Sequence, residues 1–345
     1  MISIAKNAAR RAVGVAAAAV VVPVMVLAAS VPAAAQGLLN QCWSPAELAG
    51  QPSEKPPRPH ARGAAQRIPD LRLARFAPVP PTLRGSIRRV TLPKGQKLVA
   101  LTFDLCEQSS EISGYDGAIV DYLRANEIHA TFFAGGKWLL THGERAQQLI
   151  ADPRFEMANH GWAHRNVRGL DPVALEGEVV GPQRAYEQAR SKLASRQCIA
   201  RTPAAMRNVA PRLTLYRFPY GACNPQALAT LANNGLLAVQ WDVSAGDATR
   251  VVFPETVARN VLGSVRPGSI VLMHANGRGY NTGAALKILI PKLKARGFRM
   301  VTVTELLAAG QPVITPTCYD HRLGDTDRYD RLFQVRKGTR HGSLN

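Results

Sequence analysis

From residue 98 to residue 308, short apolar runs alternate with amphipathic stretches, and this alternation constrains the fold more than any other feature of the sequence. The runs at 98–103 and 130–133 have the composition of strands, and the stretches at 113–126 and 144–151 have helical spacing. Repeated β/α units predict a parallel sheet, either closed as a barrel or open as a doubly wound layer. Further strands are predicted at 155–158, 215–218, 237–241, 269–273 and 299–302, and further helices at 172–193, 225–233, 254–264, 284–296 and 304–309.

The first 35 residues have the composition of a secretory signal peptide. Three basic residues between positions 6 and 11 precede an apolar run rich in alanine and valine, and residues 33–35 are small residues of the kind that a signal peptidase reads. An uncleaved anchor is the alternative, because the run approaches the length that spans a bilayer, although two prolines interrupt it. Both interpretations predict export, to the periplasm or the medium.

The rest of the chain divides into three parts by composition. Residues 36–97 hold 10 of the 24 prolines, and 11 lysines and arginines against three acids, which predicts a mostly extended arm or linker. Residues 98–310 carry the β/α units and form the predicted main domain. Residues 311–345 are polar and basic, and we expect a tail that docks back onto the domain or frays.

The chain is strongly basic, with 43 lysines and arginines against 24 acids and a formal net charge of +19. Such a surface attracts anionic partners. We expect no nucleic-acid partner, because the chain is predicted to be exported and the basic arm lacks interleaved aromatic residues that stack on bases. An anionic cell envelope is the partner that the arm would contact.

All five cysteines lie after residue 41, in the portion predicted to be exported, where oxidising conditions let disulfides persist. No two of them form a CxxC pair, which disfavours a zinc ribbon or a redox site of the thioredoxin type. Because five is an odd number, at least one cysteine has no partner within the chain. We therefore expect at most two disulfides.

Ionisable side chains follow five of the predicted strands, at the edge of the sheet where parallel β/α folds carry their functional groups. His160 and His164 are four residues apart, and on a helical turn this spacing places both imidazoles within reach of one divalent ion. Each residue alone would fit a surface or core position, but together they predict a metal site flanked by acidic and basic groups. The other residues of this set are Asp104, Arg217, Asp242, Asp247 and His274.

These residues resemble the motifs of a known family, the polysaccharide deacetylases with a NodB homology domain, or carbohydrate esterase family four. The resemblance covers about residues 98–308 and includes five motifs in the order of the family. The motifs are Thr102-Phe103-Asp104-Leu105, His160-Gly161-Trp162-Ala163-His164, Arg217-Phe218-Pro219-Tyr220, Ser244-Ala245-Gly246-Asp247-Ala248 and Leu272-Met273-His274.

The resemblance implies a fold and an activity. The fold would be α/β, a distorted (β/α) barrel of the NodB type, with the Pro-rich segment as an N-terminal arm. The activity would be metal-dependent hydrolysis of N-acetyl or O-acetyl groups on a glycan, with zinc as the expected metal. Peptidoglycan ranks first among the substrates, ahead of chitin-type oligomers, poly-N-acetylglucosamine and acetylated xylan, and we expect a monomer.

The resemblance also implies the main catalytic roles. His160 and His164 would hold the metal, which lowers the pKa of a water molecule to about 7 and makes it nucleophilic. Asp104 would be the general base that takes the proton of this water. His274 would be the general acid that protonates the leaving amine.

Three further groups are implied to support this chemistry. Arg217 would orient Asp104 and keep its carboxylate ionised through a charge-assisted hydrogen bond. The backbone N–H of Tyr220 would stabilise the oxyanion together with the metal. Asp247 would tune the acid histidine, and Asp242 is a nearby alternative for that role.

The sequence departs from the family pattern directly after Asp104. The family has a second aspartate there, a metal ligand, whereas this chain has Leu105. The carboxylate of Glu107, the thiolate of Cys106 or water are the possible substitutes, and Glu107 is the preferred one because zinc accepts carboxylate oxygen. Asp104 itself could also become a ligand, which would leave the role of general base open. Ala248 also replaces a tryptophan that is a wall of the substrate groove in the family.

The altered metal site leaves a second function open, a carbohydrate-binding pseudoenzyme with a degenerate metal site. Retention of both an acid and a base favours the enzyme.

Cys106 and Cys223 follow the first and third motifs, at strand ends that face the same site. Such positions can approach within the Cα separation of about 4.4–6.8 Å that a disulfide requires. We therefore predict a Cys106–Cys223 disulfide, and the alternative is that Cys106 is a free thiol that ligates the metal.

Overall fold

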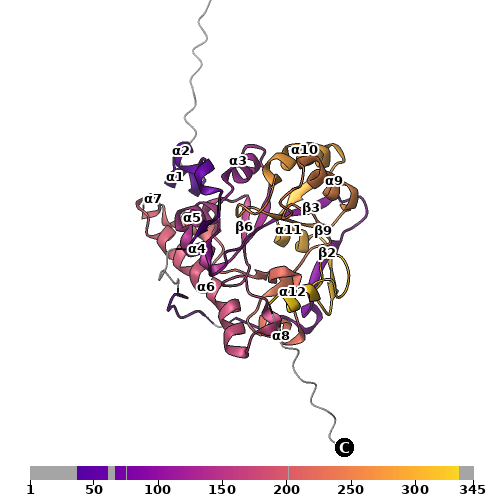
Figure 1. Ribbon diagram of the computed structural model, residues 1–345. Coiled ribbons are helices and arrows are strands. Elements are labelled where there is room, and N and C mark those ends of the chain that lie inside the picture. The colour runs from indigo at the N-terminus through magenta and orange to yellow at the C-terminus, as the bar shows by residue number, and fades with distance from the viewer. Residues whose placement is uncertain (1–36, 61–66, 75, 201, 334–345) are drawn as a thin grey trace, which may run out of the picture. The chain divides into compact units, whose positions relative to one another are not determined.

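The structure, a computed structural model, describes residues 37–60, 67–74, 76–200 and 202–333 (Figure 1). The predicted signal segment, residues 1–35, lies outside these ranges. Within them, no helix combines the length with the apolar character that crossing a bilayer requires.

A curled, mainly parallel sheet forms the centre of the domain (Figure 1). Its strand order is β12-β2-β8-β7-β6-β5-β3-β10-β9, and β11 pairs with β3 off this path. Neighbouring strands are parallel, except that β12 runs antiparallel to β2. This half-barrel confirms the predicted α/β fold. The strands are β2 (Ser86–Thr91), β3 (Leu98–Leu105), β5 (Ala130–Ala134), β6 (Phe155–Asn159), β7 (Leu215–Tyr216), β8 (Leu237–Val239), β9 (Val243–Ser244), β10 (Ile270–His274), β11 (Arg299–Val301) and β12 (Gln311–Thr315).

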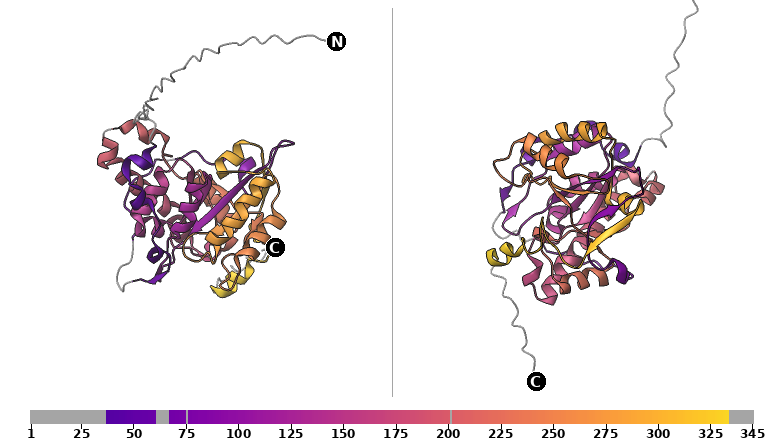
Figure 2. Two further views of the ribbon diagram at one scale, coloured as in Figure 1. Left: turned by 90° about the horizontal axis from the view of Figure 1, so that it is seen from above. Right: turned by 90° about the vertical axis from the view of Figure 1, so that its right-hand side faces the viewer.

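Helices surround the sheet in the three views of Figures 1 and 2. Local capping residues set where several of them begin. Asp171 and Asn224 accept hydrogen bonds from the backbone N–H groups of the first turns of α6 and α8, and a proline follows each cap. The helices after the strands are α3 (Gly117–Ala125), α4 (Gly136–Thr141), α5 (Gly143–Ala151), α6 (Pro172–Ala194), α8 (Pro225–Asn233), α9 (Pro254–Ser264), α10 (Thr282–Ala295) and α11 (Val303–Ala308).

The segment at 36–97, which we predicted to be a mostly extended arm, packs against the domain over much of its described length. It begins with the short helices α1 (Leu38–Cys42) and α2 (Pro45–Leu48), and the Trp43 side chain is buried. A disulfide between Cys42 and Cys198 joins α1 to α7 (Gln197–Ala200). The end of the segment contributes β2 to the main sheet. These residues therefore belong to the folded domain, which differs from the predicted solvated linker.

The predicted C-terminal tail docks back onto the domain as far as residue 333. Its first part is β12, which pairs with β2 at the edge of the sheet. Its last described element is α12 (Asp327–Leu332), and Arg168 forms ion pairs with Asp327 at 2.7 Å and Asp330 at 3.0 Å. This part of the tail therefore lies against the domain.

The predicted Cys106–Cys223 disulfide is wrong. Cys223 is bonded to Cys318 of the docked tail, with 5.4 Å between their Cα atoms, and Cys106 is the free cysteine of the described chain. The directions of the side chains explain the difference. Cys223 packs in an apolar cluster that includes Leu228 and Cys318, whereas Cys106 faces the two histidines of the second motif.

Candidate active site

The ends of four strands of the sheet, β3, β10, β6 and β7, bring the predicted site residues together. Asp104 lies near the end of β3 and is the register partner of His274, the last residue of β10. His160 directly follows β6, and Arg217 directly follows β7. The backbone N–H of Arg217 donates to the carbonyl oxygen of Asn159 at 2.8 Å, which extends the pairing of β6 and β7 into the site.

Asp104 and Arg217 form a buried ion pair. Arg217 Nη1 donates to Asp104 Oδ1 at 2.8 Å, and the arginine is fully buried. The guanidinium is further held by the carbonyl oxygen of Gln240 at 3.2 Å and by the ring of Phe133 at 3.9 Å. Burial acts to raise the pKa of Asp104, but His160 and Arg217 outweigh it and hold this pKa below its ordinary value. The carboxylate is therefore ionised at neutral pH.

His160 and His164 meet across a turn and not across a helix. Gly161 has φ +77° and His164 has φ +52°, so the backbone reverses between the two imidazoles. A Cβ at position 161 would lie 3.0 Å from a carboxylate oxygen of Glu178, which together with the positive φ favours glycine at this position. The two rings end with their centroids 5.0 Å apart.

The histidine nitrogens fit a divalent metal. The carbonyl oxygen of Arg217 lies 2.9 Å from His160 Nδ1, which must therefore carry the proton, and this leaves Nε2 with a free lone pair. Within the described chain, His160 Nε2 and His164 Nδ1 are buried and have no hydrogen-bond partner. Burial lowers the pKa of both side chains, which keeps them neutral and available as ligands. His160 Nε2 also lies 3.4 Å from Asp104 Oδ2. Buried imidazole nitrogens without hydrogen bonds suit the ligands of a metal ion.

Glu107, the preferred substitute for the missing aspartate, does not reach this cluster. Its Oε1 accepts a hydrogen bond from Thr141 Oγ1 at 2.8 Å, and its Oε2 accepts one from the backbone N–H of Ser113 at 3.2 Å. Leu105 is fully buried in the apolar core. The ligand atoms of Cys106, His160 and His164 lie within 4.8 Å of one another, and the thiol is the third group at the site.

His274 is held by Asp247 through two hydrogen bonds. Its backbone N–H donates to Asp247 Oδ2 at 2.8 Å, and its Nδ1 lies 3.0 Å from Asp247 Oδ1. Thr282 Oγ1 also donates to Oδ2, at 2.6 Å. Burial acts to lower the pKa of His274, but the carboxylate of Asp247 outweighs it and raises this pKa above its ordinary value.

Asp242, the alternative partner of the acid histidine, lies at the opposite end of the sheet. It accepts hydrogen bonds from Ser269 Oγ at 3.0 Å and from the backbone N–H of Ile270, the first residue of β10, at 2.9 Å. It also lies 3.3 Å from Arg266. This alternative is therefore wrong, and Asp242 serves to hold the start of β10.

Tyr220 lies beside the histidine turn. Its backbone is left-handed, with φ +61° and ψ +7°, an unfavourable conformation for a residue with a side chain. Its ring centroid is 4.4 Å from that of His164, 4.8 Å from that of Tyr329 and 4.9 Å from that of Phe333. The C-terminal segment therefore supplies two aromatic side chains next to the site, which the sequence motifs did not indicate.

Glu178 is a second residue that the sequence analysis missed. It lies on α6, and its Oε2 accepts hydrogen bonds from the backbone N–H groups of Trp162 at 2.8 Å and Ala163 at 3.0 Å. It thereby holds the turn that carries both histidines. The sequence could have indicated Glu178, because it lies between the apolar residues Leu175 and Val179 on one helix face, and a carboxylate on a buried face needs a partner.

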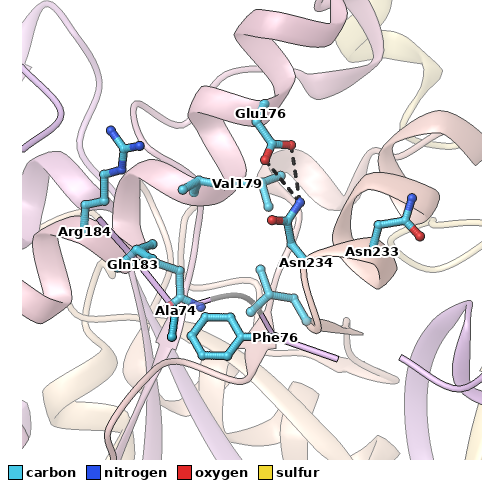
Figure 3. Close-up of a pocket in the computed structure, with 11 residues that line it drawn as sticks. Ala74, Phe76, Glu176, Val179, Gln183, Arg184, Asn233 and Asn234 are labelled. Carbon is cyan, nitrogen blue, oxygen red and sulfur yellow. Dashed lines mark hydrogen bonds between the residues drawn. The ribbon is translucent and has the colours of Figure 1, made fainter. Parts of the chain in front are cut away.

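A separate pocket of about 390 Å³ is lined by residues 73, 74 and 76, by α6 and by the end of α8, and contains none of the predicted site residues (Figure 3). Figure 3 shows Asn234 facing Glu176, and Asn234 Nδ2 donates to both carboxylate oxygens at 3.3 Å. The carboxylate of Glu176, which lines this pocket, is thus engaged within the protein.

Comparisons with known proteins point to the same family as the geometry of the site. A family model described as polysaccharide deacetylase matches residues 91–239. A chitooligosaccharide deacetylase of Bradyrhizobium sp. (strain ANU 289) is 30% identical over 61% of this chain and 91% of the relative. A peptidoglycan-N-acetylglucosamine deacetylase of Bacillus cereus is 27% identical over 62% of this chain and 70% of the relative.

Solved structures show the same fold. A family 4 carbohydrate esterase pseudoenzyme from Bacillus anthracis superposes with a TM-score of 0.53 at 24% identity, over 65% of this chain and 69% of the other. A deacetylase solved with its substrate superposes with a TM-score of 0.50 at 25% identity, over 65% of this chain and 97% of the other. The resemblance and the NodB-type fold predicted from the sequence are confirmed, and the chain belongs to the polysaccharide deacetylase family.

Proposed function

We propose that this protein is an exported, metal-dependent deacetylase that hydrolyses acetyl groups on a glycan of the cell envelope or the extracellular space. The observation that carries the proposal is the convergence of a buried ionised carboxylate, a histidine with a raised pKa and two buried histidine nitrogens without hydrogen bonds at one edge of the sheet. A groove that only binds sugar has no need for both an acid and a base.

The metal site would consist of His160 and His164. When bound there, a divalent ion, with zinc as the expected one, would polarise the acetyl carbonyl and lower the pKa of a water molecule. Asp104 would then take the proton of that water on Oδ2, because Arg217 occupies Oδ1. The ion pair keeps Asp104 in the charged form that this step requires.

His274 would protonate the leaving amine. Its Nδ1 is engaged with Asp247, so Nε2 is the nitrogen that donates to the substrate. The raised pKa of His274 favours the protonated imidazole, the form that a general acid needs before the step. The backbone N–H of Tyr220 would donate to the oxyanion that forms as the carbonyl becomes tetrahedral.

An N-acetylated envelope glycan is the proposed substrate, with peptidoglycan first and chitin-type oligomers second. Relatives named for both substrates match this chain. The net charge of +19 suits an anionic wall polymer, and the two disulfides suit an oxidising compartment. Cleavage before Gln36 would remove three basic residues and no acid, and would release a monomer that is still strongly basic to the periplasm or the medium.

Acetate release tests this function directly. Purified residues 36–345, loaded with zinc, would be incubated with peptidoglycan, with chitin oligomers and with acetylated xylan, and Asp104→Asn would be the matched inactive control. Acetate from at least one N-acetylated glycan, and none from the control, is the expected result. Saturable glycan binding without acetate release would establish the pseudoenzyme instead.

A further inference from the structure

Cys106 lies next to the two histidines of the second motif. Its Sγ and one nitrogen of each imidazole lie within 4.8 Å of one another, and the cysteine is 7% exposed. Cys106 comes two residues after Asp104, and in an extended chain side chains two residues apart point to the same face. The side chain that follows Asp104 in the sequence, Leu105, points into the core instead.

The side-chain amide of Asn276 holds the thiol of Cys106 in place. Asn276 Nδ2 donates to Cys106 Sγ at 3.0 Å and to the backbone oxygen of the same cysteine at 2.8 Å. This double contact fixes the orientation of the side chain, as hydrogen bonds from outside the coordination shell do for metal ligands. The neighbouring His160 Nε2 and His164 Nδ1 are buried without hydrogen-bond partners in the described ranges, so a ligand shared by all three atoms would satisfy them.

We propose that Cys106 is the third protein ligand of the metal, so that the ion is held by one thiolate and two imidazoles. This inference rests on the proposed function, which supplies the metal. On binding, the thiol proton is released to solvent and a metal–sulfur bond forms, with no change of oxidation state. Three protein ligands leave one tetrahedral position open, as catalytic zinc sites do.

A thiolate in place of a carboxylate changes which ions the site accepts. Soft sulfur favours zinc and cobalt, whereas magnesium and calcium prefer oxygen ligands. Leu105 therefore does not leave the site with two ligands only. The site recovers a third ligand from the next residue and becomes more selective for zinc-class ions.

Cobalt substitution of the full mature protein tests the ligand without relying on activity. The wild-type cobalt form is expected to show a thiolate-to-cobalt charge-transfer band in the near ultraviolet, and Cys106→Ser is expected to lose it. Cys106→Asp is the matched control, because it restores a ligand without sulfur and should bind cobalt without the band. Zinc affinity should fall by at least about tenfold in Cys106→Ser and less in Cys106→Asp.

The cobalt spectrum tests the thiolate ligand, and acetate release tests the proposed function, so the two can fail independently. A wild-type cobalt spectrum without the charge-transfer band overturns the thiolate ligand, even if the zinc enzyme releases acetate. A band without acetate release from any glycan supports the ligand and overturns the function. Because the wild-type spectrum needs no variant, failure of Cys106→Ser to fold would not leave the inference untested.

Discussion

His274 is the register partner of Asp104 on the neighbouring parallel strand, so the sheet itself fixes the separation of the proposed acid and base. Each has its own charged partner, Asp247 for the histidine and Arg217 for the aspartate. These partners move the two pKa values apart, upward for His274 and downward for Asp104. Two titratable groups with separated pKa values are the pattern by which one site holds an acid and a base at the same pH.

The alkaline limb of the activity profile should depend on Asp247. Activity needs protonated His274, so activity falls as the pH rises through the pKa of this histidine, which Asp247 raises. Asp247→Asn removes the charge, lowers that pKa and should move the alkaline limb of kcat to lower pH. Asp242→Asn is the matched control, because Asp242 lies at the opposite end of β10. Profiles of the two variants that coincide would contradict the role of Asp247.

Removal of the base or the acid should abolish most of the turnover. Asp104→Asn and His274→Ala are each expected to lower kcat by about 10²-fold or more, the contribution of general acid–base catalysis. Asp104→Asn should also lower the free energy of unfolding, since it leaves the buried Arg217 charge without its partner. Steady-state kinetics and circular dichroism separate the two effects, and a fold lost by His274→Ala without a separate kinetic defect would indicate a structural role.

The amount of metal bound per chain should depend on His160 and His164. We expect about one zinc-class ion per chain in the wild-type protein and none in the His160→Ala, His164→Ala double variant. Elemental analysis of dialysed protein measures both. Glu107→Gln is the matched control: its carboxylate is engaged by Thr141 and Ser113 away from the cluster, so the variant should retain the metal. Equal metal in the wild-type protein and the double variant would contradict the site.

The features that depend on nearby residues, such as helix starts and the positions of the motif residues, could be predicted from the sequence. The bounds of α8 and α9 agree with the prediction, because a proline marks the start of each helix. The motif residues converged because parallel strands carry their functional groups at one edge. Side chains two residues apart in an extended chain point to the same face. This alternation could also have favoured Cys106, two residues after Asp104, over Glu107 as the substitute metal ligand.

Features that depend on distant segments could not be predicted in this way. The partner of Cys223 is 95 residues away, in a tail whose docking depends on β12 pairing with β2. The buried Trp43 depends in the same way on contact with a remote part of the domain, and its indole N–H donates to Glu144 at 2.5 Å. Proline content at 36–97 described the local backbone but carried no information about these contacts.

The Cys223–Cys318 disulfide should hold the C-terminal segment on the domain. Peptide mapping under non-reducing conditions is expected to recover this pair, with Cys106 as an alkylatable thiol in metal-free protein. Cys318→Ser should lower the free energy of unfolding by about 2–5 kcal/mol, the usual cost of removing a native disulfide from a small secreted domain. Denaturant unfolding measures this loss, and recovery of a Cys106–Cys223 peptide would contradict the assignment.

Helix α12 should contribute to glycan binding, because Tyr329 packs against Tyr220 beside the histidine turn. Tyr329→Ala is expected to raise KM for an oligosaccharide by about two- to tenfold, the ratio that corresponds to an aromatic contact of about 0.5–1.5 kcal/mol, with kcat changed less. Leu332→Ala is the matched control on the same helix, since this side chain is 69% exposed. A fall in kcat at constant KM would show instead that Tyr329 supports the backbone of Tyr220 and does not contact the substrate.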